Sequence, residues 1–234
     1  MTLVILFLCS LLLVNRIIVY PMRPAIADVG RRLAVGGTAY FMLIGVGFMC
    51  SEMGLLQRLS VFLGHPIYSL SIVLFSLILT TGMGSLFSEK FPLNTRPRFV
   101  LWAMLASAYL AALPTWLPQM LHAFESAPLL IRAPLCVAVI APAGVLLGFG
   151  FPTGMRFIDA VDRRPTPWFW GINGAAGVLA SSAAVAVSIA FGIYVTFLIS
   201  AFCYVLLIPA GLLIGFEPAA ALVPRSGPFV GERT

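Results

Sequence analysis

Charge is what this sequence has least of. Only 9% of its 234 residues are charged, while 61% are hydrophobic. Soluble domains carry roughly a quarter of their residues as charged side chains. The 14 basic and 8 acidic residues cannot coat a soluble globule of this length. This excludes a soluble globular enzyme, a disordered chain and a disulfide scaffold, and it leaves an all-α, polytopic transmembrane helix bundle in contact with the lipid bilayer.

The sequence also lacks the short motifs by which many enzymes and metalloproteins are recognised. It contains no CxxC or His/Cys metal spacing, no Walker-type phosphate loop, no HExxH and no GxSxG. We therefore expect no cofactor, no metal and no catalytic set, although whether the chain serves an enzyme stays open. The basic residues lie in short loops between apolar runs rather than on one solvated face, so we expect no nucleic-acid partner.

Seven apolar segments are long enough to cross a membrane. One crossing needs about 20 residues, because a helix rises about 1.5 Å per residue and the hydrocarbon core is about 30 Å thick. The predicted spans are 2–20, 33–57, 67–87, 99–117, 129–155 and two within 168–216. The last stretch contains no charged residue. As a single helix it would be about 74 Å long, so we expect it to turn back near Gly192.

These spans divide the chain into four parts. Residues 1–20 form a first span, which is either complete or the remnant of a longer chain, and 21–33 form a basic loop. Residues 34–216 form a six-helix membrane module, and 217–234 form a tail.

The basic residues predict the orientation of these spans. Eleven of them fall on one side, in the loops after the first, third and fifth spans and in the tail, and only Arg58 and Arg132 fall on the other. Basic loops stay on the cytoplasmic side, so we expect these loops and the C-terminus to be cytoplasmic and the protein to lie in the inner (plasma) membrane. Met1 would then lie outside, so we expect a C-terminal piece of a longer protein or one half of a split pair.

Small residues predict where the helices approach one another. Helices in lipid associate through small residues that let their backbones come close. Glycines recur at such spacing in the fifth and sixth spans: Gly144, Gly148, Gly150, Gly154, Gly171, Gly174 and Gly177. Pro142 and Pro152 interrupt the fifth span, and a broken helix is one that can line a substrate cavity.

A few polar residues predict a pocket. An ionisable group at the centre of a membrane helix costs about 2.5–3.5 kcal/mol on insertion scales. Glu52 either reaches toward the interface, pairs with Arg58 or His65, or serves a polar cavity; pairing with Arg58 would require the helix to end between them. Asn173 either bonds a neighbouring helix or lines a pocket. The candidate pocket residues are Glu52, Gln57, Arg58, His65, Tyr68 and Asn173.

Several ordered motifs carry a family resemblance. They are 48–53 (FMCSEM), 56–58 (LQR), 63–69 (LGHPIYS), 74–76 (LFS), 82–85 (GMGS), 148–154 (GFGFPTG) and 170–175 (WGINGA). Over residues 34–216 the chain resembles the C-terminal membrane half of the bacterial spermidine-synthase-like, or fused major-facilitator and spermidine synthase, membrane proteins. The resemblance implies a six-helix module like one major-facilitator-type half, with both of its ends cytoplasmic.

The resemblance also implies a function. Family members carry an aminopropyltransferase-like domain, whose nucleotide-binding strand, glycine turn and acidic residues have no counterpart here. We therefore expect a non-catalytic membrane module of a polyamine-related system, which anchors or serves a separate aminopropyltransferase-like domain or a second membrane half. The alternative is a transporter or half-transporter for a small cationic or amphipathic solute, with Glu52, His65 and Asn173 in its pocket. A third hypothesis is a lipid-acting membrane enzyme that uses Glu52 and His65 as acid and base.

Overall fold

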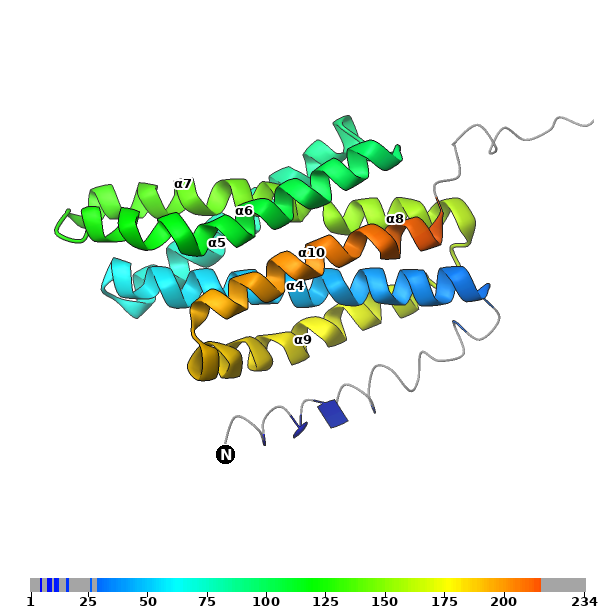
Figure 1. Cartoon of the computed structure of the whole chain (residues 1–234), viewed down its shortest axis with the longest axis horizontal. Coiled ribbons are helices and arrows are strands. Elements are labelled where there is room, and N and C mark those ends of the chain that lie inside the picture. The colour runs from blue at the N-terminus through cyan, green and yellow to red at the C-terminus, as the bar shows by residue number, and fades with distance from the viewer. Residues whose placement is uncertain are drawn as a thin grey trace, which may run out of the picture.

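The computed structural model describes residues 29–215 together with seven isolated positions before them, which are Ile5, Leu8, Cys9, Leu11, Leu12, Arg16 and Ile26. Residues 29–215 form helices and no strand (Figure 1). The helices are α4 (Arg31–Leu63), α5 (Pro66–Lys90), α6 (Arg96–Ala123), α7 (Leu129–Gly148), α8 (Gly150–Val161), α9 (Thr166–Phe191) and α10 (Ile193–Ile214).

Six of these stretches are long and apolar enough to cross a membrane, with α7 and α8 counted together as one. The predicted all-α fold, with helices of membrane-spanning length and hydropathy, is thus confirmed. The predicted first span and the tail 217–234 lie outside the continuous described range, so a seventh span stays a prediction. The predicted turn of the last apolar stretch is confirmed at Gly192. Its φ of 89° is a backbone conformation that residues other than glycine rarely adopt.

The helices end where the sequence supplies a reason. Gly64 closes α4 with a φ of 76°, and its amide bonds the carbonyl of Ser60. His65 then caps α5, since its Nδ1 accepts a hydrogen bond from the amide of Ile67 at 3.3 Å, and Pro66 occupies the first helical position.

α7 and α8 divide the predicted fifth span at Phe149. Pro152 lies in the first turn of α8, where its missing amide costs no helical bond. A proline ring also clashes with the carbonyl four residues earlier. That residue is Gly148, which is where α7 ends.

α4 lies at the centre of the bundle, where it packs chiefly against α10 and α9, while α5 packs against α7 and α10 also meets α6 (Figure 1). Aromatic side chains fill the core beside α4. Tyr40 and Phe41 are fully buried, and their rings contact Phe99, Phe157 and Phe169 at centroid distances of 5.4–6.2 Å. The Tyr40 hydroxyl donates to the carbonyl of Gly150 at 3.0 Å, which ties α4 to the start of α8.

Glycines set the closest helix contacts. A Cβ at Gly148 would overlap the carbonyl oxygen of Thr81, and one at Gly144 would overlap the hydroxyl of Thr80, so α5 and α7 meet backbone to backbone there. Gly154 similarly lies against Tyr40, whereas Gly150 makes ordinary contact with Ile44.

Among the α9 glycines, Gly174 does not pack against a neighbouring helix as predicted. A Cβ added at Gly174 would meet no heavy atom within 4 Å, and a Cβ added at Gly177 would meet only the side chain of Met49, at 3.4 Å. The close approach of α9 to α4 is made instead by Gly45 of α4, where a Cβ would lie 2.5 Å from the carbonyl oxygen of Asn173. Gly174 therefore leaves space, whereas Gly177 takes part in the contact, because its backbone nitrogen would lie 3.2 Å from a Cβ at Gly45. Gly171 is half-buried.

Basic residues gather at one end of the bundle. Eight of the ten Lys and Arg within 29–215 flank the start of α4, the α5–α6 connection and the α8–α9 connection. These three places lie at the right-hand end in Figure 1. Arg58 and Arg132 belong to the other end, near the end of α4 and the start of α7. The fold thus keeps the charge asymmetry that the sequence predicted.

Candidate functional site

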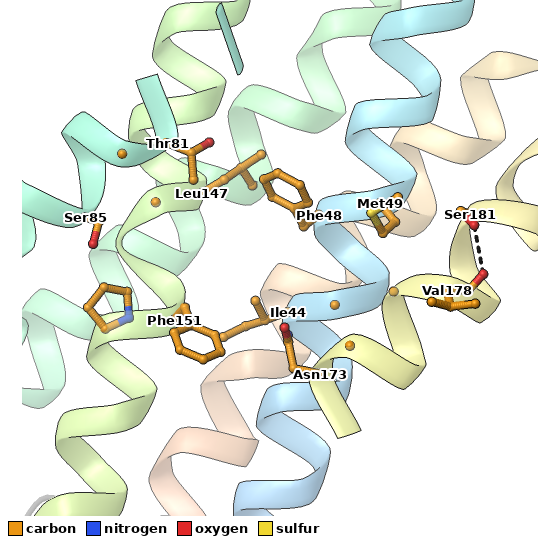
Figure 2. A pocket seen from close by; sticks show the side chains of 16 residues that line it. Ile44, Phe48, Met49, Thr81, Ser85, Leu147, Phe151, Asn173, Val178 and Ser181 are labelled. Carbon is orange, nitrogen blue, oxygen red and sulfur yellow. Dashed lines mark hydrogen bonds between the residues drawn. The ribbon is translucent and has the colours of Figure 1, made fainter. Parts of the chain in front are cut away.

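A cavity of about 530 Å³ opens between α4, α5, the α7–α8 break and α9 (Figure 2). Sixteen residues line it: Ile44, Gly45, Phe48, Met49, Thr81, Gly82, Ser85, Leu147, Gly148, Phe151, Pro152, Asn173, Gly174, Gly177, Val178 and Ser181. On α4 the lining residues are the 14th to the 19th of a 33-residue helix. The cavity therefore lies near the middle of the longest span.

Small residues create this space. Gly82 and Gly174 line the cavity, and neither has a heavy atom within 4 Å of a Cβ position. The start of α8 after the break at Phe149 forms part of the wall, with Phe151 (Figure 2) and Pro152 among the lining residues. A side chain at either glycine would point into open space, so the two glycines give the cavity part of its width.

The polar groups of the lining are few and uncharged. Asn173 donates from Nδ2 to the carbonyl of Phe41 on α4 at 2.9 Å. Both predicted roles of Asn173 therefore hold, since it bonds a neighbouring helix and lines a cavity. The hydroxyl of Ser181 donates to the carbonyl of Val178 at 2.8 Å.

Thr81 contributes an unsatisfied hydroxyl. Its Oγ1 is buried and has no hydrogen-bond partner. A membrane-helix threonine can bond a carbonyl one turn earlier, as Thr80 does with Ser76 at 2.6 Å, but Thr81 makes no such bond. A buried polar group without a partner costs about 1–3 kcal/mol.

Glu52 does not line this cavity but lies next to it. It follows Phe48 by four residues and Met49 by three, so helical spacing places it on the cavity-lining face of α4, one turn further along. Its side chain is half-buried. Helix α4 does not end between Glu52 and Arg58, so the condition for the predicted pairing of these two residues is not met.

The other predicted pocket residues lie elsewhere. Gln57 and Arg58 line a separate cavity near the end of α4. His65 is exposed, serves as the cap of α5, and has its ring 5.4 Å from that of Tyr68, which is exposed as well. Because α4 continues to Leu63, Glu52 lies about 16 Å from the end of the helix, beyond the reach of His65. The predicted single pocket is thus divided, and an acid–base pair of Glu52 and His65 does not form.

No metal site is apparent in the described part of the chain, where no three His, Cys, Asp or Glu side chains come together. The cysteines at positions 50, 136 and 203 are buried and free. Comparisons of the chain with protein families, with curated proteins and with solved structures find no match. The resemblance to the spermidine-synthase-like membrane proteins accordingly stays a prediction.

The lining residues of α5 were not foreseen as site residues. Thr81, Gly82 and Ser85 belong to a stretch that reads as ordinary helix packing, and nothing in the local pattern shows that Thr81 lacks a partner. The one available signal is the pair Gly82 and Gly84. Gly84 packs tightly on the backbone of Val145, while Gly82 faces open space.

Proposed function

We propose that this chain is an integral membrane module whose central cavity binds a small amphipathic cation, as part of a transporter or half-transporter. The 530 Å³ cavity near the middle of the spans is the observation that carries this proposal. Ligand pockets have volumes of about 300–1,000 Å³ and combine apolar walls with a few polar groups. Walls of Phe48, Phe151 and Leu147 with the polar side chains of Ser85 and Asn173 match that description.

Glu52 supplies the preference for a cation. Ionisable residues within membrane helices commonly mark substrate or ion pathways. No carboxylate lines the cavity itself, so the apolar body of a solute would lie among the aromatic residues while its positive group reached one turn along α4 to Glu52. A solute with both parts fits better than a bare inorganic cation, which would leave the apolar walls unused.

The six-helix arrangement supports a half-transporter of the major-facilitator type. If all six candidate spans cross the membrane, both ends of the module lie on the same side, and the positive-inside rule favours the cytoplasmic side. A second copy or a second membrane half would cover the open side of the cavity. The predicted role as the membrane module of a polyamine-related system is compatible with this proposal, because polyamines are cations with apolar methylene segments.

Uptake by proteoliposomes tests the proposal. The purified full chain is reconstituted, and uptake of labelled spermidine and of tetraphenylphosphonium is measured down an imposed gradient. We expect saturable uptake of at least one probe, strongly reduced by Gly174→Leu, which adds a side chain to the cavity at a position where a Cβ meets no atom within 4 Å, and by Glu52→Gln. Ala190→Leu adds nearly as much bulk, three carbons instead of four, at an exposed site on the same helix and should leave uptake unchanged.

The result that would overturn the proposal is equally concrete. Flux of both probes that matches empty liposomes, or that is the same in Gly174→Leu and the parent protein, would show that the cavity is not a solute site.

A further inference from the structure

Two arginines share a cavity at the end of the bundle that carries little other charge. Arg58 lies near the end of α4 and Arg132 in the first turn of α7. Together with residues of α6 and α10 they line a cavity of about 320 Å³, separate from the central one. Arg58 also borders an adjoining cavity of about 180 Å³ beside Tyr194.

The guanidinium of Arg132 has one hydrogen-bonded N–H group and one buried N–H group without an acceptor. Its Nη1 donates to the carbonyl of Phe62 at 2.7 Å, one of the last four carbonyls of α4, which no helical amide reaches. Its guanidinium carbon lies 5.8 Å from the centroid of the Phe62 ring. The Nε atom is buried and has no hydrogen-bond partner. Helix capping explains one donor of this guanidinium and leaves the buried Nε–H without an acceptor.

No carboxylate of the described residues neutralises the two arginines. Ion pairs within 4.0 Å involve other residues, and neither Arg58 nor Arg132 is among them. Glu125 also lines the cavity, but its carboxylate bonds His122 at 3.0 Å and is 65% exposed. The cavity therefore carries two positive charges against one negative charge that already has a partner.

We propose that this cavity is a binding site for an oxyanion, a phosphate or a carboxylate group, held by Arg58 and Arg132. The planar guanidinium fork matches both groups and forms charge-assisted hydrogen bonds with them. The anion would accept hydrogen bonds from the guanidinium N–H groups of Arg132 that face the cavity and would neutralise Arg58. Because the cavity lies at the helix ends, its occupant is either the headgroup of an anionic phospholipid or a free anion. This inference does not depend on the solute proposed for the central cavity.

The test uses the purified full chain in a neutral detergent. One arm titrates inorganic phosphate against chloride at matched ionic strength and follows thermal unfolding through the reactivity of the buried cysteines. The other arm measures phosphatidylglycerol and phosphatidylcholine adducts by native mass spectrometry. The main variant is Arg58→Gln, which removes a cation that makes no hydrogen bond or ion pair within the described residues. The control is Arg98→Gln, an exposed arginine at the basic end.

We expect Arg58→Gln to weaken binding of the anion by about tenfold or more, the effect of one lost charge-assisted contact, and Arg98→Gln to change it less than about twofold. Arg58→Lys should fall between Arg58→Gln and the parent, because it keeps the charge and loses the fork. A loss confined to phosphate identifies a free anion, and a loss confined to phosphatidylglycerol identifies a lipid headgroup. Equal effects of Arg58→Gln and Arg98→Gln, or no binding of either probe by the parent protein, would overturn the proposal.

Discussion

The contact between α5 and α7 leads to a prediction in which two glycine-to-alanine substitutions have opposite signs. At Gly148 a Cβ would overlap the carbonyl oxygen of Thr81 and lie 3.0 Å from the Cα of Gly84 and from the amide nitrogen of Ser85. These are backbone atoms of a continuous helix, so no side-chain rotation relieves the clash. At Gly174 there is no atom within 4 Å, although both glycines line the same cavity.

The magnitudes follow from these surroundings. Overpacking a tight contact costs about 1–3 kcal/mol, so Gly148→Ala should destabilise the bundle by that amount. Glycine within a helix is less favourable than alanine by about 0.8–1.0 kcal/mol, so Gly174→Ala should stabilise it by up to about 1 kcal/mol. At roughly 2–4 °C per kcal/mol for a chain of this size, we expect Tm to fall by about 2–12 °C in the first variant and to rise by about 2–4 °C in the second.

The protein carries its own reporter for this measurement. Cys50, Cys136 and Cys203 are buried and free, so a fluorogenic thiol reagent reports their exposure as detergent-solubilised protein is heated. Cys9 is exposed and provides a constant background. If Gly148→Ala melted at or above the temperature of Gly174→Ala, the α5–α7 backbone contact described above would be wrong.

Three further substitutions test other parts of the fold. Tyr40→Phe removes the buried hydrogen bond to Gly150 and should cost about 1 kcal/mol, whereas Tyr68→Phe, at an exposed ring, should cost nothing measurable in the same melting assay. Gly192→Ala forces an alanine into a φ of 89° and ψ of 157° and should lower the free energy of unfolding by about 1–3 kcal/mol. The control is Gly30→Ala, at a φ of −53° with open space around it. Equal Tm values for the two variants would refute the strained turn. In the α8–α9 connection, hydrogen bonds from Arg164 lower the pKa of Asp162 from its usual value of 3.8. The ion pair therefore stabilises the fold above that pH, and this stabilisation is lost as the pH falls through the lowered pKa. Asp162→Asn should reduce Tm at neutral pH and match the parent in strong acid, and a difference that persisted in acid would contradict the ion pair.

The spans were predictable because lipid imposes simple rules on a sequence. Hydrophobic length, the positions of the basic residues and one flexible glycine at position 192 were enough to place six of the helices. The position of the break in the fifth span was not predicted from its prolines. The break falls at Phe149, three residues before Pro152, because a proline disturbs the carbonyl four residues before it and is tolerated in the first turn of the next helix.

The site was less predictable because it depends on contacts distant in sequence. Glu52, Arg58 and His65 are near one another in the sequence, which suggested one pocket, but the unbroken helix to Leu63 keeps them apart. Thr81 gives no local sign of its state, because nothing in the sequence around it shows that its hydroxyl lacks a hydrogen-bond partner. Glycine spacing found the contact at Gly148 and misassigned Gly174, because the pattern does not distinguish a glycine that admits a neighbour from one that leaves space.

Two-sided cysteine labelling tests the membrane arrangement on which the proposed function depends. Single cysteines are introduced at the exposed positions Thr95, Arg163 and Glu125, and intact cells are treated with a membrane-impermeant thiol reagent. We predict that the cysteine at position 125 reacts in intact cells, while those at positions 95 and 163 react only after permeabilisation. Labelling of 95 and 163 from opposite sides would contradict the six-span arrangement and the place of the cavity within it.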